Sequence, residues 1–105
     1  MNLAPTLEID GNKIDLARLA AVCTRYGLAE LALFGSVARG EAGGDSDIDL
    51  LYVLEPNAQL GFAIDDLEDD LTYLLGRRVD LVSKKGLHPL LRDEVVAQAR
   101  TLYAA

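Results

Sequence analysis

The sequence contains one cysteine, one histidine and no tryptophan, and it is poor in basic residues. A single cysteine excludes a disulfide framework within the chain and suggests a reducing, cytoplasmic setting. No apolar run approaches the roughly 20 residues that a transmembrane helix needs, and the first ten residues lack a signal-peptide pattern, so we expect no membrane association. The 10 Lys and Arg against 17 Asp and Glu give a net charge of −7, which argues against direct nucleic-acid binding through phosphate contacts.

The 105 residues, half of them hydrophobic, suit one domain spanning residues 1–105. Apolar side chains recur at helical spacing between Asp15, a candidate N-cap, and Gly27, and again over residues 60–74. A last helix is predicted from Pro89 to about residue 102. Short apolar runs at residues 31–34, 48–54 and 78–83 are typical of buried strands. The pattern predicts an α/β fold, a small mixed sheet flanked by helices.

Two aspartates at the start of the second predicted strand are the first sign of chemistry. Asp47 and Asp49 are two residues apart, so on a strand both carboxylates point to one face, while Ile48 and Leu50 point to the core. Like charges aimed at one space either raise one pKa or hold a cation between them. Oxygen ligands of this kind suit Mg²⁺ or Mn²⁺. The alternative without a functional role is that both aspartates lie at a solvated strand end.

A third carboxylate, Asp80, lies in the next predicted strand among apolar neighbours, where aspartate is unfavourable. If the strands that carry Asp49 and Asp80 are neighbours, three carboxylates converge, which is the ligand set of a two-metal site for phosphoryl transfer. The alternative for Asp80 alone is a turn cap or an ion pair with Arg77 or Arg78.

The segment between the first two predicted strands resembles a phosphate cradle. Gly35 and Ser36 directly follow an apolar run, and a strand that leads into a glycine turn and a helix start offers backbone N–H groups to an anion. Arg39 adds a bidentate cation, although Glu41 stands where a Walker A loop requires lysine. A plain tight turn and a surface ion pair are the alternatives for Gly35 and Arg39.

Taken together, Gly35-Ser36-x-Ala38-Arg39-Gly40, Ser46-Asp47-Ile48-Asp49 and Asp80 closely resemble the polymerase-β-like nucleotidyltransferase motif. Within that superfamily the chain is most similar to minimal nucleotidyltransferase antitoxins, the partners of HEPN-domain RNase toxins. The resemblance implies that Asp47, Asp49 and Asp80 are catalytic and bind two Mg²⁺ ions, with Mn²⁺ as a substitute. It also implies transfer of AMP from ATP to a tyrosine of the toxin. The residues expected to bind the nucleotide are Gly35, Ser36, Arg39 and Ser46.

Two other functions fit the same motif less well. An antitoxin could neutralise its toxin by binding and occlusion alone, without catalysis. A nucleotidyltransferase for a small molecule such as an aminoglycoside generally carries a further helical domain for its acceptor, for which 105 residues leave no space. Outside the motif, Cys23 is expected in the core, and His88 on the surface or at a helix cap.

Overall fold

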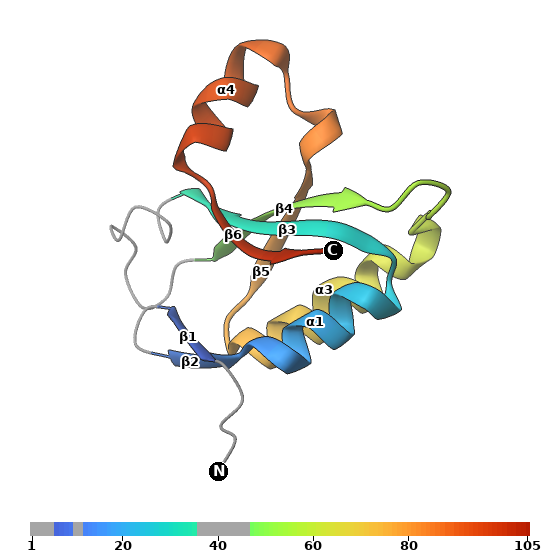
Figure 1. Ribbon diagram of the computed structural model, residues 1–105, viewed down its shortest axis with the longest axis vertical. Helices are drawn as coiled ribbons and strands as arrows, with labels where there is room; N and C mark the ends of the chain where they lie inside the picture. Colours follow the sequence, from blue (N-terminus) through green and yellow to red (C-terminus); the bar gives the residue numbers. More distant parts are fainter. Residues whose placement is uncertain (1–5, 10–11, 36–46) are drawn as a thin grey trace.

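The computed structural model describes residues 6–9, 12–35 and 47–105. A mixed sheet with the strand order β5-β4-β3-β6 forms the centre of the fold. β3 pairs antiparallel with β4 and β6, whereas β4 and β5 run parallel and are connected through α3. The helices α1 and α3 cover one face of the sheet and α4 lies on the opposite side, so helices flank the sheet as the sequence predicts (Figure 1). The elements are β1 (Thr6–Ile9), β2 (Asn12–Asp15), α1 (Leu16–Arg25), β3 (Leu28–Phe34), β4 (Ile48–Leu54), α3 (Ile64–Leu75), β5 (Val79–Ser83), α4 (Pro89–Gln98) and β6 (Arg100–Ala104).

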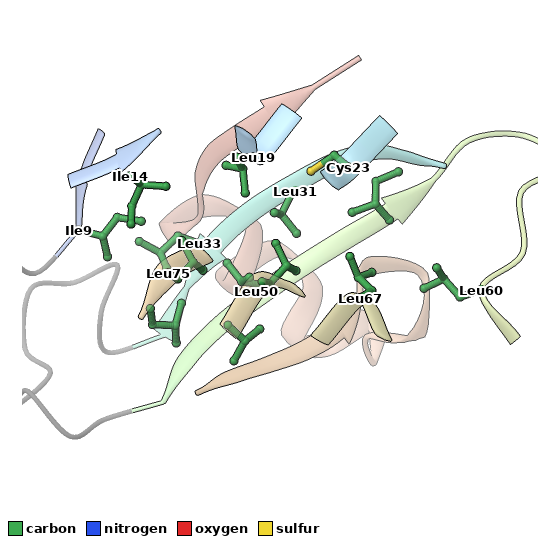
Figure 2. Packing of buried hydrophobic residues seen from close by; sticks show 14 residues of the cluster. Ile9, Ile14, Leu19, Cys23, Leu31, Leu33, Leu50, Leu60, Leu67 and Leu75 are labelled. Atoms are coloured by element: carbon green, nitrogen blue, oxygen red, sulfur yellow. The ribbon is translucent and has the colours of Figure 1, made fainter. Parts of the chain in front are cut away.

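The main hydrophobic core lies between the sheet and the helices α1 and α3. Figure 2 shows how leucines from both layers interdigitate there, with Leu50 of β4 and Leu67 of α3 fully buried. Cys23 on α1 is also fully buried, as predicted for a core position, and this burial raises the pKa of its thiol from 9.0 to about 12. One face of the sheet therefore packs against α1 and α3 in the main core, and α4 lies on the side of the other face.

The ends of α1 and α3 follow from local chemistry. The Asp15 carboxylate accepts hydrogen bonds from the backbone N–H groups of Ala17 and Arg18, at 2.9 and 3.3 Å, and so caps α1 as predicted. α3 follows a short 3₁₀ helix, Gly61–Ala63, and ends at Gly76, whose φ of +74° is a left-handed conformation that suits glycine. Across the two helices, the Tyr26 hydroxyl donates a 2.6 Å hydrogen bond to Asp70.

The last helix is shorter than the sequence predicts. α4 begins at Pro89, with the imidazole of His88 accepting a hydrogen bond from the Leu90 N–H, which confirms the capping role expected of this histidine. It stops at Gln98 because Ala99 turns to an extended conformation, φ −71° and ψ 143°. The expectation of helix to residue 102 is wrong, since β6 follows and pairs with the free edge of β3.

An antiparallel hairpin of β1 and β2 precedes α1 and was not predicted from the sequence. Its apolar residues Ile9 and Ile14 are buried and join the main core. The hairpin therefore packs as part of the same hydrophobic unit as α1, α3 and the sheet. Among the helices of the described residues, none is long and apolar enough to cross a membrane.

Candidate active site

The acidic residues lie where β4 and β5 begin, at the end of the sheet where β3 finishes. β4 and β5 are parallel and in register, so Asp49 and Asp80 are direct Cα partners. Such partners are about 4.8 Å apart across a sheet, and their side chains point to the same face. The neighbouring-strand arrangement on which the sequence interpretation depended is therefore confirmed for these two carboxylates.

The face that carries these aspartates is opposite to the main core. Ile48 and Leu50, the neighbours of Asp49 along β4, are 1% and 0% exposed and belong to the core cluster. Alternation along the strand then directs Asp49 away from α1 and α3, toward the α4 side of the sheet. Asp49 is half-buried and Asp80 is exposed, so the site opens to solvent at β5.

Asp47 directly precedes β4 and is exposed. The Ile48 N–H next to it donates a 2.8 Å hydrogen bond to the carbonyl oxygen of Arg78, which fixes the starts of β4 and β5 against each other. Three carboxylates thus lie at one end of two adjacent strands. Within the described residues, however, no group of three or more Asp, Glu, His or Cys side chains is arranged to hold a metal ion as it stands. Metal binding by all three carboxylates remains a prediction.

Gly35 has a structural role that the sequence interpretation missed. Its φ is +75°, and a Cβ added at this position would clash with Asp49 Oδ2 and would lie 3.1 Å from Asp49 Cγ. Phe34, the residue before it, is the antiparallel partner of Asp49. Only glycine therefore lets the chain leave β3 while the Asp49 carboxylate keeps its place. The signal was a glycine at the end of an apolar run, which was interpreted as a phosphate-binding turn, with a plain tight turn as the alternative.

The remaining predicted nucleotide-binding residues, Ser36, Arg39 and Ser46, lie outside the described residues. In the described part of the site, Asp47, Asp49 and Asp80 form an acidic row at the starts of β4 and β5. Phe34 at the end of β3 is the partner of Asp49, and Gly35 is in close contact with the Asp49 carboxylate. A cation between two neighbouring carboxylates relieves their repulsion, and their oxygens are the ligands that Mg²⁺ and Mn²⁺ prefer. The donor chemistry therefore fits a divalent cation of this type.

Known proteins are similar to this chain in both sequence and fold. The protein adenylyltransferase MntA of Thermococcus cleftensis is 49% identical over 63 residues, which cover 60% of this chain and 63% of that protein. A solved structure assigned to a minimal nucleotidyltransferase matches with a TM-score of 0.68 and 46% identity, over 80% of this chain and 84% of that chain.

The same fold occurs in a toxin–antitoxin complex. A chain of the Shewanella oneidensis complex of tri-AMPylated HEPN toxin with MNT antitoxin matches with a TM-score of 0.59 and 23% identity, over 86% of this chain and 70% of that chain. The family model described as "Nucleotidyltransferase domain" matches residues 19–102, which include the whole acidic row. This chain belongs to the nucleotidyltransferase domain family.

Proposed function

We propose that this protein is a Mg²⁺-dependent adenylyltransferase that transfers AMP from ATP to a tyrosine of a HEPN-domain toxin, and that it acts in this way as the antitoxin. The observation that carries the proposal is the pairing of Asp49 with Asp80 beside Gly35. Nucleotidyltransferase family membership supports the reaction type, and 49% identity to a protein adenylyltransferase supports a protein acceptor.

Asp47, Asp49 and Asp80 are the residues that would hold the metal, with two Mg²⁺ ions as the expected number and Mn²⁺ as a substitute. Bound ions would neutralise charge on the α-phosphate and on the leaving pyrophosphate. Gly35, with Ser36, Arg39 and Ser46 in the following segment, would bind the triphosphate through backbone N–H groups, hydroxyls and a guanidinium. Gly35, where this segment begins, is in close contact with Asp49 at the end of β3.

The chemical step is an in-line substitution at phosphorus. The oxygen of the acceptor tyrosine attacks the α-phosphorus of ATP, and the bond from that phosphorus to the oxygen bridging to the β-phosphorus breaks. Pyrophosphate leaves with the bonding electrons, and the phenolic proton passes to the Asp80 carboxylate and then to water. Asp80 suits this role because it is exposed, so a hydroxyl carried by another protein can reach it.

Transfer of label from ATP tests the proposal. The protein is incubated with Mg²⁺, ATP labelled at the α-phosphate and the HEPN protein encoded by the neighbouring gene. We expect label on the HEPN protein with the wild type and none with Asp47→Asn/Asp49→Asn. The matched control is Asp65→Asn/Asp69→Asn, which makes the same charge change at exposed positions of α3 and should leave transfer unchanged.

Two results would overturn the proposal: no labelled HEPN protein with the wild type, or full labelling with Asp47→Asn/Asp49→Asn. Growth of cells that express the toxin separates catalysis from occlusion. If the double variant still protects those cells, neutralisation proceeds by binding and the catalytic account of the antitoxin is wrong.

A further inference from the structure

The face of the sheet that carries the acidic row continues into an apolar floor. Along β4, side chains two and four residues after Asp49 belong to Leu51 and Val53, so the floor extends about 13 Å from the row. Leu51 and its β3 partner Ala32 are only 3% and 4% exposed. Together with Val53 they line a small cavity of about 80 Å³, and Val96 and Ala99 line the same cavity from the α4 side.

Basic side chains surround the open end of this floor. A wider groove of about 360 Å³ is lined by Val53, Lys84, Lys85 and Arg92, with Glu30 as its one acidic member. Lys84 forms an ion pair with Glu30 at 3.8 Å, and no ion pair among the described residues involves Lys85 or Arg92. On a protein with a net charge of −7, this groove is a local concentration of positive charge.

α4 itself has apolar side chains that the described residues cover only in part. It contains no buried residue, and Leu90, Leu91 and Val96 are 83%, 54% and 40% exposed. A helix on a small domain normally buries one apolar stripe. Exposed apolar residues of this kind are typical of a surface that binds another protein. Asp93 and Glu94, three and four residues after Leu90, make the helix itself net negative, so the positive charge belongs to the groove lined by Lys84, Lys85 and Arg92.

We infer that the α4 surface, consisting of Leu90, Leu91, Lys85, Arg92 and the groove beside them, docks the acceptor protein through a segment with acidic side chains next to apolar ones. The inference rests on the proposed function. The positive charge of the groove complements acidic side chains, and the groove lies on the same sheet face as Asp49 and Asp80. About four extended residues span the distance from Val53 to the acidic row, so a docked protein can present a hydroxyl there.

A second groove has comparable chemistry but lies on the wrong side of the sheet. It has a volume of about 380 Å³ and is lined by Arg18 and Arg25 of α1 and by Tyr73 of α3, which is 87% exposed. Because α1 and α3 cover the core face, opposite to α4, a protein docked there would be separated from Asp80 by the sheet (Figure 1). This groove therefore supplies the matched control.

The experiment compares Lys85→Glu/Arg92→Glu and Leu90→Ser/Leu91→Ser with the control variants Arg18→Glu/Arg25→Glu and Tyr73→Ser. Affinity for the purified HEPN partner is measured by titration calorimetry, and AMP transfer is measured against partner concentration. We expect each α4 variant to weaken binding and to raise KM for the partner by about tenfold or more. In the α4 variants, kcat at saturating partner and the affinity for Mg-ATP should stay within about twofold of the wild type. In both control variants, the affinity for the partner and its KM should also stay within about twofold.

Wild-type affinity in the α4 variants would overturn the inference, and so would loss of binding in the Arg18→Glu/Arg25→Glu control. Sedimentation showing a wild-type dimer that Leu90→Ser/Leu91→Ser dissociates would assign the surface to a second copy of this chain and refute partner docking. If the partner binds through the α4 surface but receives no AMP, the proposed function fails and the docking surface stands. If AMP transfer is intact in every α4 variant, the docking inference alone fails.

Discussion

Replacing Gly35 with alanine tests the closest contact in the acidic site. The residue adopts φ +75°, so any L side chain costs about 1–2 kcal/mol for the left-handed backbone. In addition, the new Cβ would lie 3.1 Å from Asp49 Cγ and 3.3 Å from Asp49 Cβ, and it would clash with Oδ2. Oδ2 is the free end of the Asp49 side chain and can rotate away, so the contacts with Cγ and Cβ set the added cost, about 1 kcal/mol at the lower end of overpacking penalties. We expect a total loss of about 2–3 kcal/mol in the free energy of unfolding.

Gly76→Ala is the matched control for this prediction. Gly76 has nearly the same backbone, φ +74°, but a Cβ there would meet no atom within 4 Å. Urea denaturation should therefore show a loss of only about 1–2 kcal/mol for Gly76→Ala, with AMP transfer unchanged. Gly35→Ala should lower kcat/KM by about 100-fold, because the Asp49 carboxylate has to move.

A double-mutant cycle isolates the contact itself. Asp49→Ala removes the carboxylate and leaves only its Cβ near position 35, so most of the overpacking cost of Gly35→Ala should vanish in that background. The reasoning is refuted if Gly35→Ala and Gly76→Ala destabilise the protein equally, or if the cost of Gly35→Ala is the same with and without the Asp49 carboxylate.

Three further predictions concern a buried leucine, the buried cysteine and the hydrogen bond between Tyr26 and Asp70. Leu71→Ala removes a fully buried side chain and should cost about 2–5 kcal/mol in urea denaturation; a loss below 1 kcal/mol would contradict the packing. The Cys23 thiol, with its pKa raised to about 12 by burial, should resist alkylation at pH 8 until denaturant is added, and its contribution to stability should be lost as pH rises from about 9 to 12. The hydrogen bond to Asp70 raises the pKa of Tyr26 above 10.0, so the folded state keeps a proton that the unfolded state loses. Tyr26→Phe should therefore lower the free energy of unfolding by about 1 kcal/mol near pH 8 and by progressively less above pH 10. An equal loss at pH 8 and above pH 10 would refute the hydrogen bond as the cause.

Local signals in the sequence were sufficient for the helices α1 and α3 and for the strands β3, β4 and β5. Asp15 and the helical spacing that follows it predicted α1, because a cap and an amphipathic stripe are properties of neighbouring residues. The alternation of Asp49 with Ile48 and Leu50 predicted which face of β4 is buried. The pairing of Asp49 with Asp80 could be expected only on the condition that β4 and β5 are neighbours. Their register depends on how α3, which connects the two strands along the chain, packs against the sheet.

The two elements that were not predicted, β6 and the β1–β2 hairpin, were missed for different reasons. β6 follows α4 without any glycine or proline. It exists because the edge of β3 provides backbone partners far away in the sequence, as in the pairing of Leu31 with Tyr103, which are 72 residues apart. The β1–β2 hairpin did have a local signal, the dipeptide Asp10-Gly11 between its strands, which is typical of hairpin turns. The contact of Gly35 with Asp49 required the three-dimensional structure.

The state of the partner's tyrosines after coexpression tests the central claim most directly. The HEPN protein is purified from cells that coexpress it with the wild type, with Asp49→Asn or with the exposed-site control Asp69→Asn, and its intact and peptide masses are measured. The account predicts AMP on a tyrosine of the partner with the wild type and the control, and none with Asp49→Asn. An unmodified partner from the wild-type strain, or equal modification by Asp49→Asn, would contradict it.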